Sequence, residues 1–101
     1  IAERGSFFGY GDLVVDFRNF HYIAKAGALS VFDLTHSLQN PGGGQTGGNK
    51  DSWKTLLKAA LGAGIDGLFA EVHPDPENAL SDKKTQFNFD EFRELTELLR
   101  S

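Results

Sequence analysis

Residues 30–36 form the clearest hydrophobic pattern in the chain. They make a short run, rich in β-branched and aromatic side chains, that ends in polar residues. A glycine-rich stretch follows, from Pro41 to Gly48. Such a run is typical of a buried strand in a parallel sheet, and the stretch after it would lie at the carboxyl end of that strand. We therefore predict a strand that ends in a functional loop.

A helix is predicted directly after this loop, because apolar side chains recur there at three- to four-residue spacing. The apolar positions are Trp53, Leu56, Leu57, Ala60 and Leu61. Gly62 and Gly64 follow, and glycine commonly ends a helix. This part of the chain thus predicts the order strand, loop, helix.

The same order repeats towards the carboxyl terminus. Residues 67–73 predict a second buried strand that Pro74 ends, and a polar loop continues to about Gln86. Asn88 is placed to cap a final helix, with Glu91 as its partner in a capping box. The apolar stripe of that helix is predicted to consist of Phe89, Phe92, Leu95, Leu98 and Leu99.

The first third of the chain shows a weaker form of the same pattern. Residues 13–17 form a short apolar run, and a helix is indicated by Phe17, Phe20, Ile23 and Ala24. Alternating strands and helices predict parallel βα units, of which two or three are a fraction of a (β/α)8 barrel of about 250 residues. We expect an α/β fold in which residues 1–101 are the carboxyl-terminal portion of a TIM barrel, with the upstream strands absent.

Composition and charge exclude some classes of partner and some kinds of metal ligand. A net charge of -4 offers no general attraction for nucleic acid or an anionic membrane, so anionic substrates must be held by local cations and amides. No segment approaches the roughly 20 apolar residues that span a bilayer. Without cysteine, a metal site must use histidine and carboxylates. We expect a cytoplasmic protein with neither a nucleic-acid nor a membrane partner.

Candidate metal ligands follow the predicted strands. Residues at the carboxyl ends of barrel strands face the active site, and His36, Glu71 and His73 hold such positions. With Asp82 from the next loop, His36 and Glu71 form a nitrogen and oxygen set suited to manganese, iron or zinc. The alternatives are a structural role for His36, and solvated loop positions for His73 and Asp82. For His73, contact with substrate and orientation of the turn at Pro74 are equally open.

Two segments could bind phosphate. Arg4 can grip a phosphate with two hydrogen bonds, and Gly5 permits a close backbone approach. An exposed ion pair between Arg4 and Asp12 or Asp16 is the alternative.

The glycine-rich loop is the second segment. It offers backbone amides, the Thr46 hydroxyl and, just after it, the Lys50 ammonium group. A flexible linker is the alternative.

Four segments, in order along the chain, resemble the 3-deoxy-D-manno-octulosonate 8-phosphate synthases. They are residues 3–5, 8–10 with 13–18, 32–39 and 71–82. The resemblance implies the end of barrel strand six through the eighth βα unit. It also implies a transferase that condenses phosphoenolpyruvate with arabinose 5-phosphate in lipopolysaccharide sugar biosynthesis, in a chain that is inactive by itself.

Two alternatives to this activity stay open. The 3-deoxy-D-arabino-heptulosonate 7-phosphate synthases share the Arg-Gly strand end and a similar Glu-x-His-Pro-x-Pro segment. Residues 8–10 (Phe-Gly-Tyr) and 35–39 (Thr-His-Ser-Leu-Gln) favour the octulosonate enzymes. The other alternative is a non-catalytic barrel remnant that acts in assembly or phosphate binding.

The resemblance also assigns residues. His36, Glu71 and Asp82 match the family's metal-ligand positions, which makes them the expected catalytic residues. Arg4 matches an arginine that binds the phosphoenolpyruvate phosphate.

Further expectations concern the second substrate and the metal. Thr46 falls in the loop that reaches a neighbouring subunit's arabinose 5-phosphate site, and Lys50 stands where the family often has arginine. The resemblance implies a homotetramer. Residues 17–18 and 79–86 look more like the metal-requiring form, which uses manganese, iron or zinc, than the form without a cofactor.

Overall fold

A three-stranded parallel sheet organises the chain. The computed structural model describes residues 1–7, 13–40, 47–48, 50–78 and 85–100. The sheet order is β1-β4-β7, with β1 at Ala2–Glu3, β4 at Val31–Asp33 and β7 at Gly67–Phe69. Because β1 and β7 both pair in parallel with β4, the three carboxyl ends meet at one edge. The predicted α/β class with a parallel sheet is confirmed.

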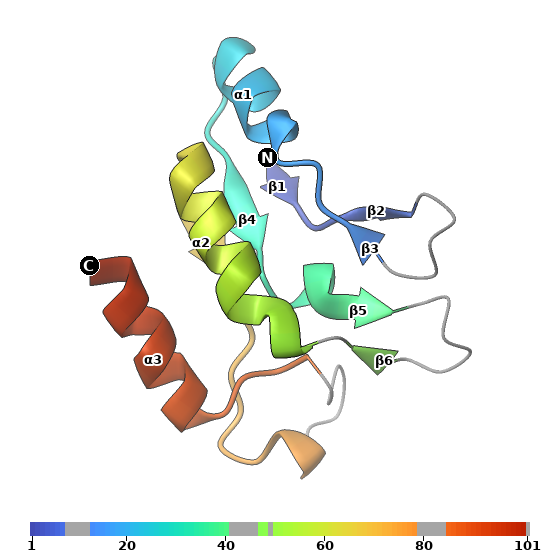
Figure 1. Cartoon of the computed structure of the whole chain (residues 1–101), viewed down its shortest axis with the longest axis vertical. Helices are drawn as coiled ribbons and strands as arrows, with labels where there is room; N and C mark the ends of the chain where they lie inside the picture. Colours follow the sequence, from blue (N-terminus) through green and yellow to red (C-terminus); the bar gives the residue numbers. More distant parts are fainter. Residues whose placement is uncertain (8–12, 41–46, 49, 79–84, 101) are drawn as a thin grey trace.

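Three helices accompany the sheet. They are α1 (Arg18–Lys25), α2 (Trp53–Ala63) and α3 (Phe89–Arg100). Figure 1 shows α2 along one face of the sheet next to β4, with α3 on the outer side of α2. The three helices fall where the hydrophobic periodicity predicts them, which confirms the predicted alternation of strands and helices.

Two short antiparallel hairpins extend the carboxyl edge of the sheet. One pairs β2 (Ser6–Phe7) with β3 (Leu13–Val14), after β1. The other pairs β5 (Gln39–Asn40) with β6 (Gly47–Gly48), after β4. Both project to the same side of the molecule (Figure 1). The predicted loop after β4 therefore contains a hairpin.

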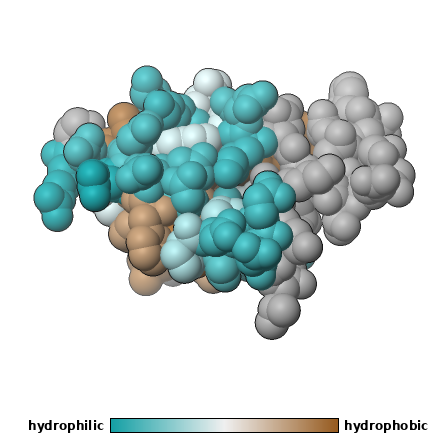
Figure 2. All heavy atoms as spheres, turned by 90° about the horizontal axis from the view of Figure 1, so that it is seen from below, coloured by the Kyte–Doolittle hydropathy of each residue, from teal (hydrophilic) through white to brown (hydrophobic). Residues whose placement is uncertain are grey.

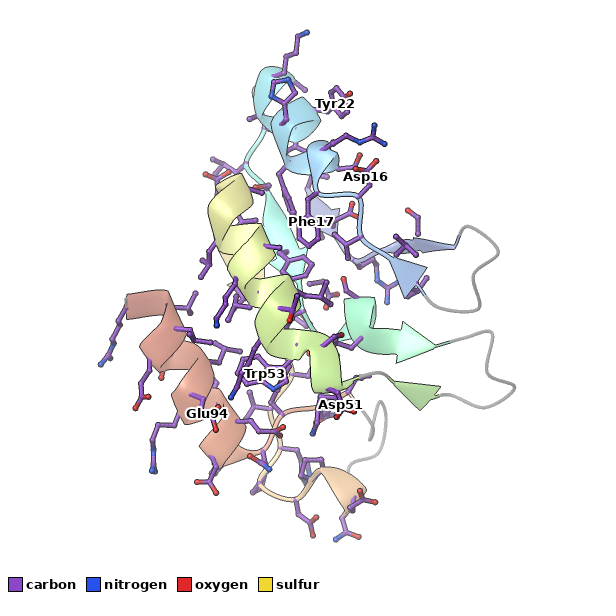
Figure 3. The ribbon with its side chains drawn as sticks, in the orientation of Figure 1. Asp16, Phe17, Tyr22, Asp51, Trp53 and Glu94 are labelled. Carbon is purple, nitrogen blue, oxygen red and sulfur yellow. The ribbon has the colours of Figure 1, made fainter. Side chains whose placement is uncertain are left out.

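The core lies between the sheet and its helices. Phe32 of β4, Leu57 of α2 and Phe87 are completely buried in it. Phe17 points towards this core from the segment before α1 (Figure 3), and its ring centroid lies 6.1 Å from those of Phe20 and Phe32. Trp53 fills the space between α2 and α3, with its ring centroid 5.4 Å from that of Phe87. These aromatic contacts attach the helices to the sheet.

Local caps explain where the helices end. Gly64 follows α2 with a φ of 86°, a left-handed conformation that glycine adopts without strain. Gly62 lies inside the helix, so of the two glycines predicted to end α2 only Gly64 does so. Before α3, the Glu91 amide donates to Asn88 Oδ1 at 2.8 Å, and the Asn88 amide donates to Glu91 Oε1 at 2.9 Å. The predicted capping box is confirmed.

The strand predicted for residues 67–73 was wrong in two respects. It ends at Phe69, because residues 71–73 pair with Phe87 instead: the Phe87 amide donates to the Glu71 carbonyl and the His73 amide to the Phe87 carbonyl. It is also not buried, since Phe69 is 45% exposed. Among the described strands, β7 has a neighbour on one side only.

The strand predicted for residues 30–36 is likewise shorter. The β4 strand stops at Asp33, and His36 begins a 3₁₀ helix, η1 (His36–Leu38). The cause is local: the Asp33 carboxylate accepts a hydrogen bond from the His36 amide at 2.9 Å, which closes a turn. His36 therefore follows the strand end across this turn.

The surface is mostly polar with local hydrophobic exposure. Figure 2 shows a brown hydrophobic cluster on one side of a largely teal surface. The exposed large apolar residues are Ile1, Tyr22, Leu29, Leu61, Phe69, Phe89, Phe92 and Leu99. In the part of the chain that the structure describes, no helix has the length and apolar character needed to cross a membrane.

Candidate active site

The parallel sheet brings three of the predicted site residues to one edge. Arg4 directly follows β1, and His36 follows β4 after a turn. Glu71 lies just beyond the end of β7. Since β4 is central, His36 lies between the other two chain segments. The edge thus carries a guanidinium group, an imidazole and a carboxylate.

Asp33 holds His36 through two hydrogen bonds. Its Oδ2 lies 2.7 Å from His36 Nδ1, and its Oδ1 accepts from the His36 backbone amide at 2.9 Å. An ionised carboxylate only accepts hydrogen bonds, so the imidazole donates from Nδ1. Asp33 is only 7% exposed. The His36 ring is therefore anchored from the last residue of a buried strand.

The other imidazole nitrogen faces Glu71. His36 Nε2 lies 3.5 Å from Glu71 Oε1. The backbone of Glu71 is fixed by Thr35, whose Oγ1 accepts from the Glu71 amide at 2.7 Å. The Phe69 ring stacks against the imidazole, with centroids 6.1 Å apart and an interplanar angle of 21°. The turn after β4 and the segment after β7 thus place the two side chains together.

Arg4 lies beside the same carboxylate. Its Nε is 3.9 Å from Asp33 Oδ2, and its side chain is 58% exposed. The proposed alternative partner Asp16 is paired with Arg18 instead, at 2.8 Å from Nη2 to Oδ2. Hydrogen bonds from Arg18 lower the pKa of the Asp16 carboxyl group. Arg4 therefore presents its positive charge to solvent at this edge of the sheet.

The chemistry of His36 and Glu71 fits a divalent cation. A neutral imidazole that donates from Nδ1 carries a lone pair at Nε2, and here it faces a carboxylate oxygen at 3.5 Å. Two facing acceptors need a cation or a proton between them. Two ligand atoms that each lie about 2.0 to 2.2 Å from the same ion are separated from each other by a distance similar to that between His36 Nε2 and Glu71 Oε1. The pair therefore has the spacing of two ligands of one ion.

A third ligand is not supplied by the described residues. Within residues 1–7, 13–40, 47–48, 50–78 and 85–100, no group of three or more His, Cys, Asp or Glu is placed to hold a metal ion. The predicted ligand Asp82 and the predicted phosphate contact Thr46 lie outside the described ranges, as does Asp12. The structure thus brings two of the three predicted ligands together.

Lys50 and His73 have other contacts. Lys50 Nζ donates to Glu91 Oε1 at 3.0 Å and to the Gln86 carbonyl at 3.2 Å, so it binds the capping box of α3. His73 Nδ1 accepts from the Asp75 amide at 2.9 Å, which places His73 in the turn around Pro74. This contact matches the expected role of His73 in orienting the turn at Pro74, and the expected substrate contact stays a prediction.

Two residues of the site carried no predicted role. Asp33 and Thr35 belong to the 32–39 segment, but the sequence alone assigned them no contact. Asp33 gives one usable signal: it is a carboxylate in an apolar strand, and a buried carboxylate needs partners. The role of Thr35 gives no such signal, because its partner is a backbone amide 36 positions away.

Two relatives of this chain carry the same name. A protein 45% identical over 99% of this chain is the "2-dehydro-3-deoxyphosphooctonate aldolase" of Legionella pneumophila (strain Lens). A protein of the same name from Xanthomonas campestris pv. campestris (strain B100) is 46% identical over 98% of this chain. The chain spans 37% of the length of each of these two relatives.

Solved structures give a consistent result. One similar structure is the crystal structure of phospho-2-dehydro-3-deoxyheptonate aldolase (DAHP synthase) from Thermotoga maritima, with a TM-score of 0.79 and 32% sequence identity. The match covers 98% of this chain and 27% of the solved chain. A second is a truncated form of 3-deoxy-D-arabino-heptulosonate 7-phosphate synthase from Thermotoga maritima, with a TM-score of 0.77 and 32% sequence identity. That match covers 98% of this chain and 36% of the solved chain. The model of the DAHP synthetase I family matches residues 1–101. Because that match covers the whole chain, the chain belongs to the DAHP synthetase I family.

Proposed function

We propose that the protein condenses phosphoenolpyruvate with D-arabinose 5-phosphate to give 3-deoxy-D-manno-octulosonate 8-phosphate and inorganic phosphate. C3 of phosphoenolpyruvate forms a bond to the sugar aldehyde carbon, and the aldehyde oxygen takes up a proton. Water adds to C2, and phosphate leaves from C2 as the keto group forms. This reaction would serve lipopolysaccharide sugar biosynthesis in the cytoplasm.

The relatives favour this activity over its seven-carbon counterpart. Identity is 45% to a relative named for the octulosonate product and 32% to the structures named for the heptulosonate product. A seven-carbon product would require a four-carbon aldose phosphate in place of arabinose 5-phosphate. The choice of aldose is therefore the first property to measure.

The barrel is the second part of the proposal. We infer that β1, β4 and β7 are consecutive strands near the end of a TIM barrel. The free side of β7 supports this inference, because the next strand of a closed barrel would pair with that side. Active sites of such barrels lie at the carboxyl ends of the strands, where Arg4, His36 and Glu71 are found.

Arg4 would bind the phosphate of phosphoenolpyruvate. Its exposed guanidinium offers several donors in one plane, which match two phosphate oxygens. Gly5 follows with a φ of 95°, which only glycine reaches easily, and so sets the direction of the chain after Arg4. Binding both substrates side by side would convert a two-body collision into a reaction within one complex.

His36 and Glu71 would hold a divalent metal ion, together with Asp82. Manganese, iron or zinc suits this donor set, and such an ion would supply Lewis acidity towards water or the aldehyde. His36 contributes a lone pair from Nε2, and Glu71 contributes a negative charge. Thr35 and Phe69 restrict the motion of these ligands through the contacts described above.

The second phosphate is assigned to the segment after β4. Thr46 would reach the arabinose 5-phosphate of a neighbouring subunit in a homotetramer. Lys50 would contribute its ammonium group, and for that role it would have to leave Glu91, to which it is bound at 3.0 Å.

The meeting of Arg4, His36 and Glu71 at one edge is the observation that carries this proposal. The direct test is an assay of the full-length protein with phosphoenolpyruvate and either arabinose 5-phosphate or a four-carbon aldose phosphate. We expect phosphate release and an eight-carbon product with arabinose 5-phosphate. Turnover only with the four-carbon sugar would favour the heptulosonate activity, and no turnover with either would favour a non-catalytic role.

A further inference from the structure

We propose that Asp33 is the positioning residue that fixes the tautomer of His36 and directs its Nε2 lone pair towards Glu71. Only the expected consequence of this inference, an effect on metal binding, rests on the proposed function. The contacts that carry the inference do not depend on any substrate. Asp33 touches neither the expected metal nor the expected phosphate. It acts through His36.

The two oxygens of Asp33 receive two different donors from the same residue. Oδ1 accepts from the His36 backbone amide at 2.9 Å, and Oδ2 lies 2.7 Å from His36 Nδ1. The backbone amide is always a donor, so Oδ1 has a fixed role. Oδ2 can only accept as well, so Nδ1 must carry the proton. The neutral ring then has its lone pair at Nε2, on the side of Glu71.

Asp33 is itself held firmly. It is the last residue of β4 and pairs with Phe69 of β7, and the next amide, that of Leu34, donates to the Phe69 carbonyl at 2.9 Å. Asp33 is 7% exposed, and the Arg4 guanidinium 3.9 Å away compensates part of its charge. A side chain in such a place has few alternative rotamers. The hydrogen-bond direction that it imposes is therefore preorganised.

The substitution Asp33→Asn separates shape from hydrogen-bond direction. Asparagine has the same size but one oxygen and one NH₂ group. The backbone amide of His36 would donate its hydrogen bond to the asparagine oxygen, and the NH₂ group would then face Nδ1. Nδ1 must accept in that arrangement, so the proton moves to Nε2. The ring would stay in place while its lone pair points away from Glu71, as an aspartate-to-asparagine change does in serine protease triads.

The experiment reads the tautomer directly. The full-length protein is labelled with ¹⁵N-histidine, stripped of metal, and studied by NMR at alkaline pH. The His36→Gln variant assigns the His36 signals. We expect a protonated Nδ1 in the wild type and a protonated Nε2 in Asp33→Asn. Asp90→Asn, an exposed change on α3, is the matched control and should leave the His36 signals unchanged.

A second measurement links the tautomer to the ligand. Titration of the metal-free protein with Zn²⁺ should show an affinity roughly 10- to 100-fold lower for Asp33→Asn than for the wild type, the usual effect of changing a carboxylate behind a metal-bound histidine. Asp90→Asn should bind Zn²⁺ like the wild type.

The outcomes separate this inference from the proposed function. A wild-type His36 protonated at Nε2 would overturn the role of Asp33. This NMR measurement needs no variant that might fail to fold. An unchanged tautomer in folded Asp33→Asn would overturn it too. A tautomer switch in a protein that neither binds Zn²⁺ nor condenses the two substrates would support the role of Asp33 and contradict the proposed function.

Discussion

Thr35 Oγ1 accepts a hydrogen bond of 2.7 Å from the backbone amide of Glu71, a residue 36 positions later in the chain. Thr35 is completely buried in the turn after β4. Its partner lies just past β7, so the bond joins the two segments that carry His36 and Glu71. Together with the pairing of β4 and β7, this contact holds the two segments in register.

Replacing Thr35 with valine should destabilise the full-length protein by about 1 to 3 kcal/mol, because the buried Glu71 amide loses its acceptor. Urea unfolding measures this change. Thr35→Ser is the matched control, since it keeps the oxygen and loses only a methyl group. A valine variant as stable as the wild type would show that the Glu71 amide finds another partner.

The pairing of Asp16 with Arg18 predicts a pH effect. Hydrogen bonds from Arg18 lower the pKa of the Asp16 carboxyl group, so ionised Asp16 favours the folded state. This contribution is present above the pKa of the unfolded chain and is lost as pH falls through the lower, folded pKa. We expect a ¹³C NMR titration to give a higher Asp16 pKa in Arg18→Gln than in the wild type.

Arg93→Gln is the control for that titration, because Arg93 lies exposed on α3. It should leave the Asp16 pKa unchanged. An Asp16 pKa equal in the wild type and in Arg18→Gln would mean that the pair of Asp16 and Arg18 does not persist in solution.

Lys50 and Glu91 allow two roles of one ammonium group to be separated. Lys50→Gln removes both the ion pair and the cation, whereas Glu91→Gln removes the ion pair and leaves the cation. If Lys50 binds the sugar phosphate, only Lys50→Gln should raise the KM for arabinose 5-phosphate, by roughly tenfold or more for a lost charged hydrogen bond. Equal KM values in both variants would restrict Lys50 to stabilising the start of α3.

Arg4→Ala should weaken the use of phosphoenolpyruvate far more than it weakens folding. The side chain is 58% exposed and its contact to Asp33 is long, at 3.9 Å, so little stability depends on this contact. Losing a hydrogen bond to a charged phosphate costs about 1.5 to 3 kcal/mol, or roughly ten- to more than a hundredfold in affinity. Steady-state kinetics measures the loss, and Arg18→Ala is the matched control.

Much of the fold could be predicted from the sequence because its signals are local. The periodicity of α2 and α3 and the Asn88 capping box depend on residues a few positions apart. The extent of β7 could not be predicted, because residues 71–73 pair with Phe87 by tertiary contact. The same limit applies to the site: strand ends predicted His36 and Glu71, but the turn geometry that brings in Asp33 and the long-range bond from Thr35 become visible only in the fold.

The most direct test of the site is to locate a metal ion in it. A crystal of the full-length protein loaded with Zn²⁺ can be measured at the zinc absorption edge. We predict one anomalous peak about 2.0 to 2.2 Å from both His36 Nε2 and Glu71 Oε1, with Asp82 as a further ligand. A peak elsewhere, or no peak in a protein that condenses its substrates fully in the presence of a chelator, would contradict the metal site.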